Sequence, residues 1–316
     1  MLNLNFQPIL LALLQALILL ALAPLMTGIS RQMRARMHSR RGPGVWQDYR
    51  DIFKLLKRQD VAPAASGFVF QAMPFVMFGV MLLVAMALPV FTHHSPLGVI
   101  ADIITVAYLF ALARFFFSLA GIDSGSLYAG LGATREATLG VLVEPIMILS
   151  LLVVALIEGS TNIGSISDSI ANGYGQSPTA IVLAMLAFGF AVFIEMGKLP
   201  FDMAEAEQEL QEGPLTEYSG SSLAILKLGL GLKKVVMAQF FIGVFLPFGI
   251  ATDLNAGGLA MAIAVVAIPV RLAVIFFLAA LVENSMARGR FMLTSRVTWV
   301  GFGVAALSFV FYLAGL

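Results

Sequence analysis

Long apolar stretches dominate the chain and are separated by shorter polar segments. A helix needs about 20 apolar residues to cross a hydrocarbon core roughly 30 Å thick. Eight segments meet this requirement, with expected bounds at 6–27, 68–91, 100–120, 138–157, 178–197, 230–250, 258–282 and 297–315. The pattern predicts an all-α integral membrane protein of about eight transmembrane helices, a tilted helical bundle with cytoplasmic amphipathic or loop helices. No long polar linker divides the chain, so we expect 1–316 to form a single polytopic membrane domain.

The distribution of Lys and Arg supports the sixth span and predicts the orientation. Span 230–250 is the weakest of the eight, because Lys233 and Lys234 stand at its start and only 16 residues follow them. With eight spans, every Lys and Arg except Arg114 and Arg271 falls in alternate loops or at their edges. The positive-inside rule then places these loops in the cytoplasm and both termini in the periplasm of a bacterial inner membrane.

Composition narrows the chemistry that the chain itself can perform. Apolar residues make up 59% of the chain and charged residues 12%, whereas roughly a quarter of residues are charged in soluble domains. There is no cysteine, which excludes disulfides and Cys-ligated zinc or iron–sulfur sites within the chain. His93 and His94 lack the spacing of a metal site on a helix, and we expect them in a solvent-exposed loop. We therefore expect no metal or redox centre here and no nucleic-acid partner; the lipid bilayer is the solvent.

A basic segment follows the first span. Five arginines precede a turn at Gly42-Pro43-Gly44, and apolar residues then recur at helical spacing from Trp46 to Leu56 with charged residues between them. This alternation predicts an amphipathic helix at the membrane interface. Anchoring to anionic lipid is one interpretation, and a docking surface for a soluble partner is the other.

An acidic segment follows the fifth span. Its carboxylates lie within 16 residues with no base among them: Asp202, Glu205, Glu207, Glu209, Glu212 and Glu217. If the segment were helical, Asp202, Glu205, Glu209 and Glu212 would share one face and repel one another. Repulsion of this kind favours proton uptake unless basic residues pair with the acids. A solvated acidic loop is the alternative interpretation.

Four ionisable residues fall inside predicted spans: Arg114, Glu144, Glu195 and Arg271. A charge at that depth costs at least about 2.5 kcal/mol, so each needs a partner or water. Pro145 follows Glu144, and a proline within a helix leaves a carbonyl without its usual donor, which favours entry of water. Structural ion pairs and a proton path are both consistent with this pattern, and the two carboxylates are the stronger proton-path candidates.

Several motifs taken together resemble a known family. They are Arg41-Gly42-Pro43 followed by Lys54-Leu55; Tyr128-Ala129 with Gly132-Ala133 and Arg135; Glu144; and Glu195 with Lys198, Pro200-Phe201-Asp202, Glu205, Glu207, Glu209-Leu210, Gly213 and Glu217-Tyr218. In order, spacing and membrane side they resemble the subunit 1 family of respiratory complex I, the NADH-quinone oxidoreductase. The resemblance covers almost the whole chain.

Two departures refine this resemblance. Only three residues separate Pro43 from Gln47, where quinone-reducing members carry a longer insert, and Lys198 stands where an arginine is usual. The chain looks most like the component C or D type membrane subunit of hydrogenase-4 and formate hydrogenlyase, which are group 4 membrane-bound nickel–iron hydrogenases. The resemblance implies a non-catalytic subunit that binds no cofactor itself, with the nickel–iron centre and iron–sulfur clusters in its partners.

The implied partners are the nickel–iron hydrogenase large and small subunits, iron–sulfur electron-transfer subunits, an antiporter-like membrane subunit and formate dehydrogenase. The resemblance implies a proton path through Glu144, Glu195, Lys198, Asp202, Glu205, Glu207, Glu209 and Glu217, to which Arg271 is added as an intramembrane charge. Docking or chamber-lining candidates are Arg36, Arg40, Arg41, Lys54, Lys57, Arg135 and Tyr218.

Two other functions stay open from the sequence. One is a quinone-chamber subunit of a complex I type NADH-quinone oxidoreductase, against which the short Pro43 to Gln47 interval counts. The other is an independent ion channel or transporter, against which the long cytoplasmic loops and the lack of a visible internal repeat count.

Overall fold

A computed structural model describes residues 6–173, 177–252, 258–287 and 291–315; of Phe6, Glu207, Gln208, 258–261 and 291–293 it describes only the backbone. The helices are α1 (Phe6–Met37), α2 (Gln47–Leu56), α3 (Phe68–Ala87), α4 (Ile103–Asp123), α5 (Leu127–Glu158), α6 (Ile163–Asn172), α7 (Pro178–Glu195), α8 (Glu207–Leu210), the 3-10 helix η1 (Gly213–Glu217), α9 (Gly220–Phe245), α10 (Gly258–Ser285) and α11 (Phe291–Leu313). Eight of them are long and apolar enough to span a membrane. This confirms the predicted all-α fold with eight spans.

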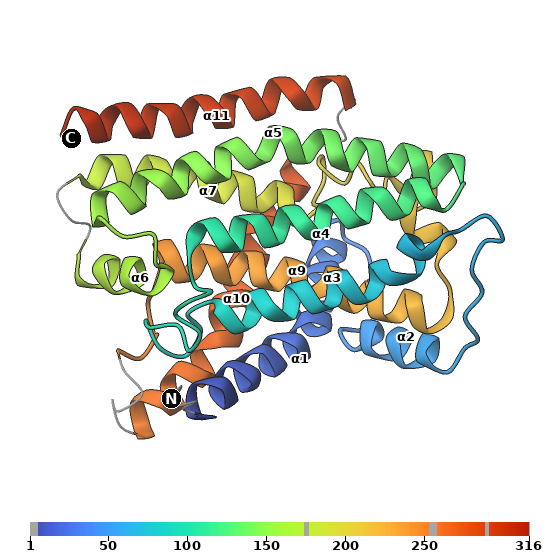
Figure 1. The fold of residues 1–316 in the computed structure, drawn as a ribbon, viewed down its shortest axis with the longest axis horizontal. Coiled ribbons are helices and arrows are strands. Elements are labelled where there is room, and N and C mark those ends of the chain that lie inside the picture. Colours follow the sequence, from blue (N-terminus) through green and yellow to red (C-terminus); the bar gives the residue numbers. More distant parts are fainter. Residues whose placement is uncertain (1–5, 174–176, 253–257, 288–290, 316) are drawn as a thin grey trace.

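The long helices run side by side, with α9 near the middle of the bundle (Figure 1). Helix α9 packs against α1, α2, α3, α6, α7 and α10, while α5 packs against α4, α7 and α11. Both ends of the described chain lie at one end of the bundle, and α2 lies at the other (Figure 1). An even number of spans requires this placement of the two termini on one side.

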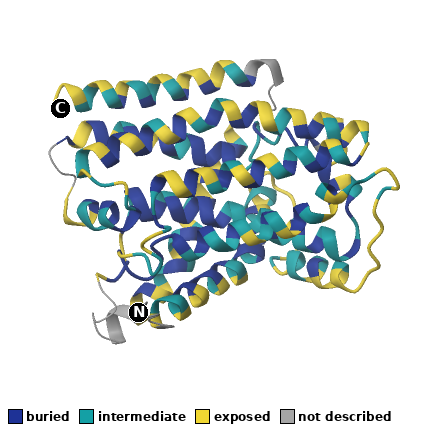
Figure 2. Cartoon of the chain, viewed as in Figure 1, coloured by how far each residue is buried: buried dark blue, intermediate teal, exposed yellow. Residues whose placement is uncertain are grey.

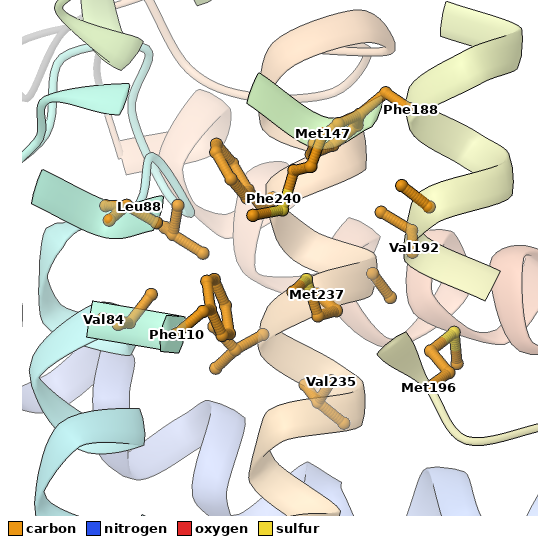
Figure 3. Packing of buried hydrophobic residues seen from close by; sticks show 14 of the residues in the cluster. Val84, Leu88, Phe110, Met147, Phe188, Val192, Met196, Val235, Met237 and Phe240 are labelled. Carbon is orange, nitrogen blue, oxygen red and sulfur yellow. The ribbon is translucent and has the colours of Figure 1, made fainter. Parts of the chain in front are cut away.

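Buried residues lie on the inward sides of the helices and exposed residues on the outward sides (Figure 2), and apolar residues occur among both. Phe110 from α4, Phe188 from α7 and Phe240 from α9 are each at most 2% exposed and meet in the interior (Figure 3). Apolar residues such as Leu10, Phe75 and Val266 are more than half exposed. This distribution is the one expected when the surrounding solvent is lipid, because outward-facing side chains are then apolar too.

Three spanning helices differ most from their expected bounds. Helix α1 continues ten residues beyond the predicted end at 27, α5 begins eleven residues before 138, and α9 begins at Gly220 rather than at 230. The predicted bounds followed the loss of apolar character, whereas backbone hydrogen bonds continue the helix past the membrane surface wherever no residue interrupts them. Arg31, Arg34 and Arg36 are therefore helical. The prediction that they lie in a loop is wrong.

The acidic segment does not form the single helix that was considered. Only α8 and η1 are regular there, and the φ angles of Ala206, Gln211 and Glu212 are positive (23°, 50° and 72°). These left-handed conformations interrupt a right-handed helix. The expected acidic face therefore does not form, and the carboxylates diverge into different surroundings.

Polar groups at the end of the bundle opposite α2 are bound by side chains from other helices. The Gln15 side-chain amide donates to the carbonyls of Ala85, Met86 and Leu88, and that of Gln239 donates to the carbonyl of Pro89. Carbonyls at the C-terminal end of a helix have no donor within it and must find one elsewhere in a membrane. The chain beyond α3 is thereby held inside the bundle.

The prediction for the histidine pair is half wrong. His94 is exposed, but His93 is 3% exposed, and its Nδ1 lies 3.1 Å from the hydroxyl of Ser167 on α6. Packing of α6 over this loop buries the first imidazole, which the local sequence does not reveal. Within the described residues, no group of three or more metal-ligating side chains occurs.

Candidate functional site

An arginine from α4 joins two carboxylates from other spanning helices. The guanidinium of Arg114 donates to Glu144 of α5 and to Glu195 of α7. Arg114 and Glu195 are each only 7% exposed. These three charges in the spans therefore pair with one another inside the bundle, as the cost of an isolated membrane charge requires.

A lysine from α9 enlarges this group. Lys233 Nζ lies 3.0 Å from Glu195 and 3.7 Å from Glu136 of α5. We call Arg114, Glu136, Glu144, Glu195 and Lys233 the buried ion-pair cluster. It contains three carboxylates and two cations, so its formal charge is −1 when every group is ionised. Uptake of one proton makes the cluster neutral, and a membrane interior favours neutral groups.

A cavity of about 50 Å³ lies beside the cluster and is called the inner cavity below. Its lining includes Glu136, Glu195 and Lys233 from the cluster and Asp202 and Glu205 from the acidic segment. A water molecule needs roughly 10–15 Å³ of such space and two to four polar partners. The inner cavity has both the room and the partners for several waters.

Two larger hollows lie next to the inner cavity. The first, about 430 Å³, is bordered by α1, α2, α9 and the acidic segment, and the second, about 240 Å³, lies between α1, α10 and the segment after α7. We call them the α2 hollow and the α10 hollow. Glu205 and Lys234 line the inner cavity and both hollows. Exposed Glu212 and Lys227 on the lining of the α2 hollow show that it reaches the surface.

A second set of ion pairs lines the α10 hollow. Glu283 of α10 is 5% exposed and accepts from Arg34 at 3.0 Å, while Lys198 Nζ lies 3.3 Å from it. Lys198 also donates to the hydroxyl of Ser30 at 2.8 Å. Burial lowers the pKa of Lys198 below its usual range; the carboxylate of Glu283 opposes this shift and the nearby charge of Lys234 adds to it. These contacts fasten the start of the acidic segment to α1 and α10.

The structure brings four of the predicted proton-path residues to these cavities: Glu195, Lys198, Asp202 and Glu205. A fifth, Glu144, contacts Arg114, which lines the inner cavity. Glu209 lies apart from them at the surface, 2.7 Å from Arg135, and Glu217 ends η1 half-buried. The side chain of Glu207 lies outside the described residues.

Arg271 lies at the opposite end of the bundle from the acidic segment. Its guanidinium donates to the carbonyls of Phe248 and Val90 at 3.1 and 3.3 Å. These contacts hold the two chain segments that follow α9 and α3 together. In this structure its surroundings are backbone carbonyls, and it does not line the three cavities described above.

The docking candidates separate into exposed and buried groups. Arg36, Arg40, Arg41, Lys54 and Lys57 are all exposed on the end of α1, the turn after it and α2.

Tyr218, by contrast, is 5% exposed, stacks on Phe70 and donates its hydroxyl to the Phe70 carbonyl at 2.8 Å. Burial, and then the charge of Asp123, raises the pKa of its phenol. Tyr218 fastens the acidic segment to α3.

Sequence reasoning missed Glu136, Lys233, Lys234 and Glu283 as site residues. A signal for Glu136 was present, because Glu136, Gly140 and Glu144 recur at steps of four and share one face of α5. Lys233 and Lys234 were assigned to the edge of a loop, since α9 was expected to begin near them. The early start of α9 places both lysines well inside that helix instead.

The fold and the ion pairs define the class of this chain: it is a multi-pass helical membrane protein with a buried network of charged side chains. The sequence profile described as "NADH dehydrogenase" matches residues 9–314, and the chain belongs to this family, which contains subunit 1 of complex I. The predicted family is thereby confirmed.

Individual relatives fall within hydrogenase complexes as well as complex I. The chain is 62% identical to "Hydrogenase-4 component C" of Escherichia coli strain K12, covering 96% of both chains. It is 57% identical to "Formate hydrogenlyase subunit 4" of the same organism, covering 96% of this chain and 98% of that one.

The fold is also that of a subunit in a solved structure of an archaeal membrane-bound sulfane sulfur reductase. The TM-score is 0.85, the identity is 22%, and 97% of this chain and 99% of that one are covered.

Proposed function

We propose that this chain is the non-catalytic membrane subunit of a hydrogenase-4 or formate hydrogenlyase type complex. Two relatives at 57–62% identity carry these names and align over nearly the full chain. In this role it anchors a cytoplasmic nickel–iron hydrogenase arm and couples hydrogen evolution to proton translocation. The nickel–iron centre and iron–sulfur clusters reside in the partner subunits, and both termini of this chain face the periplasm.

The observation that carries the coupling role is the buried ion-pair cluster beside the inner cavity. Its formal charge of −1 gives it a place for one extra proton, and Glu205 and Lys234 connect it with hollows that reach the surface. Conformational or charge changes at the acidic segment alter the field at the cluster, because both line the same cavity. A redox arm docked on that segment therefore has a physical means of changing the proton occupancy of the cluster.

The anchoring role is supported by charge at the α2 end of the bundle. Exposed arginines and lysines on the end of α1 and on α2 form a basic surface there, made up of Arg36, Arg40, Arg41, Arg50, Lys54, Lys57 and Arg58. Basic surfaces of this kind steer and orient acidic partners. The proposed occupants of this end are the hydrogenase large and small subunits with their iron–sulfur subunits; an antiporter-like subunit lies beside the bundle, and formate dehydrogenase joins the complex.

The chemistry of the α2 hollow counts against the quinone alternative. Seven of the residues that line it are charged: Arg31, Asp48, Asp51, Glu205, Glu212, Lys227 and Lys234. Sites for apolar ring compounds are lined mostly by hydrophobic and aromatic side chains with few polar groups. Asp48 of α2 also accepts from both Thr27 and Arg31 of α1 and fastens the two helices together at this hollow.

The coupling role is tested in the assembled complex. Glu195→Gln and Glu144→Gln remove carboxylates from the cluster, and Glu158→Gln is the control because Glu158 is the last residue of α5 and lines none of the three cavities. Hydrogen evolution and proton movement are measured together in inverted membrane vesicles, with sodium ionophores added to exclude sodium movement. We expect the two cluster variants to evolve hydrogen without moving protons. Native coupling in assembled, active cluster variants would refute the role.

A further inference from the structure

One acid and one base line all three cavities, and among the described residues neither forms an ion pair. Lys234 of α9 and Glu205 of the acidic segment are both half-buried, and each lines the inner cavity, the α2 hollow and the α10 hollow. Among the described residues, no oppositely charged group lies within 4.0 Å of either. Charged groups at such a position usually pair or are hydrated.

The two other lysines on these linings that are not exposed, Lys198 and Lys233, behave differently. Lys233 is shared between Glu195 and Glu136, and Lys198 contacts both Glu283 and Ser30. Both are held on two sides, so their ammonium groups have fixed positions. Lys234 is next to Lys233 in the chain but lines all three cavities, and no carboxylate of the described residues lies within 4.0 Å of it.

The side chain of Lys234 has room to move between two acidic surroundings. One is the negatively charged cluster beside the inner cavity, and the other is Glu205, which lines that cavity and both hollows. Lysine carries its charge on a flexible four-carbon stem, and the ammonium group is a compact donor. One ammonium cannot neutralise both acidic surroundings at once, so its position decides which of them holds a proton.

We propose that Lys234 and Glu205 form an ion pair that opens and closes during turnover and controls proton entry to the cluster. When Lys234 turns toward the cluster, as the absence of a pair here allows, Glu205 takes up a proton from water in the α2 hollow and becomes a neutral carboxylic acid. When Lys234 returns to Glu205, the carboxyl group releases that proton to water in the inner cavity and is again a carboxylate. This inference rests on the proposed function, since it names residues that serve the same coupling.

Three substitutions at position 234 separate the effect of the side-chain charge from that of the side-chain length. Lys234→Met keeps the apolar stem and removes the charge, Lys234→Gln removes the charge and keeps a polar end, and Lys234→Arg keeps the charge. The complete complex is purified with its hydrogenase subunits to confirm assembly and is then assayed in proteoliposomes for protons moved per hydrogen evolved. We expect Lys234→Met and Lys234→Gln to lower that ratio about tenfold or more, while Lys234→Arg keeps a larger share.

The pairing itself is tested with Glu205. Glu205→Gln is expected to lower the ratio as Lys234→Met does, and the double variant is expected to be no worse than either single one, because both substitutions remove the same interaction. Exchanging the two charges, with Lys234→Glu and Glu205→Lys together, is expected to recover coupling that each single reversal loses.

Measuring Glu195→Gln in parallel distinguishes a failure of the Lys234 inference from a failure of the proposed function. If Lys234→Met and Lys234→Gln move protons at the native ratio while Glu195→Gln does not, the Lys234 inference is wrong and the proposed function stands. If none of these three variants lowers the ratio of protons moved to hydrogen evolved, or if the native complex moves no protons, both the Lys234 inference and the proposed coupling role are wrong. Additive losses in the Lys234 and Glu205 double variant would refute the pairing.

Discussion

Gly140 of α5 lies directly against the side chain of Arg114 of α4. A Cβ atom at position 140 would overlap the Cδ and Nη1 atoms of that arginine. Because Glu136 and Glu144 stand one helical turn before and after Gly140, the glycine lets the guanidinium lie on the acidic face of α5. Arg114 can then reach Glu195 on α7 at the same time.

The first prediction concerns this close approach. Gly140→Ala displaces the Arg114 side chain from Glu144 and Glu195, and we expect it to destabilise the protein by about 1–3 kcal/mol, as overpacking does. Gly130→Ala in the same helix is the matched control, since nothing lies within 4 Å of a Cβ there. Thermal unfolding of both variants, followed by fluorescence-detected size-exclusion chromatography, compares them. Equal melting temperatures would show that Arg114 is not held at Gly140.

The second prediction separates the ion pairs from the space they occupy. Arg114→Met removes a cation from the buried carboxylate of Glu195 and from the half-buried carboxylate of Glu144, and it should cost about 3–5 kcal/mol. Adding Glu144→Gln to Arg114→Met removes the uncompensated charge and should recover part of that loss. The melting temperatures of the two single variants and the double variant give the coupling between the sites. Additive losses would argue against a direct ion pair.

Three members of the cluster could be predicted from the sequence, but neither their pairing nor the other two members could. A charge in a span needs a partner wherever it lies, so Arg114, Glu144 and Glu195 were identifiable by depth alone. Their pairing depends on which helices pack together, which the order of the spans does not specify. Glu136 and Lys233 were missed because helices α5 and α9 both begin well before their predicted first residues.

The acidic segment shows a second limit of prediction from sequence. Spacing suggested a helical face, but three breaks at Ala206, Gln211 and Glu212 send its carboxylates in different directions. The close contact of Gly132 on α5 with Ala204 and Pro214 shapes this path, since a Cβ on Gly132 would overlap both. Such a contact joins residues more than 70 positions apart and has no local signature.

The third prediction is a pH dependence at the α10 hollow. Burial lowers the pKa of Lys198 below the value of 10.5 that it has when unfolded. Between these two pKa values the unfolded state binds more protons than the folded state, so the contribution of Lys198 to stability increases with pH in that window. The melting temperatures of the native protein and of Lys198→Met are measured from pH 7 to about pH 10. The melting temperature of the native protein minus that of the variant should increase as the pH rises.

Glu283 supplies the control for this effect. Its carboxylate opposes the lowering of the Lys198 pKa, so Glu283→Gln should lower that pKa further and move the pH window downward. A pH profile of Glu283→Gln that coincides with the native one would contradict the assignment of the titration to Lys198.

The fourth prediction concerns the basic surface at the α2 end. Lys54→Glu and Lys57→Glu reverse two exposed charges on or next to α2 without touching the cavities. If an acidic hydrogenase arm docks here, both variants should retain less of it on purification, and the loss should be smaller at high salt, where charges are screened beyond about 3 Å. Arg296→Glu is the control, because Arg296 is an exposed base on α11, across the bundle from α2 (Figure 1). Equal retention of hydrogenase subunits in all three variants would place the arm elsewhere, whereas a loss confined to the α2 variants would identify this surface as its dock.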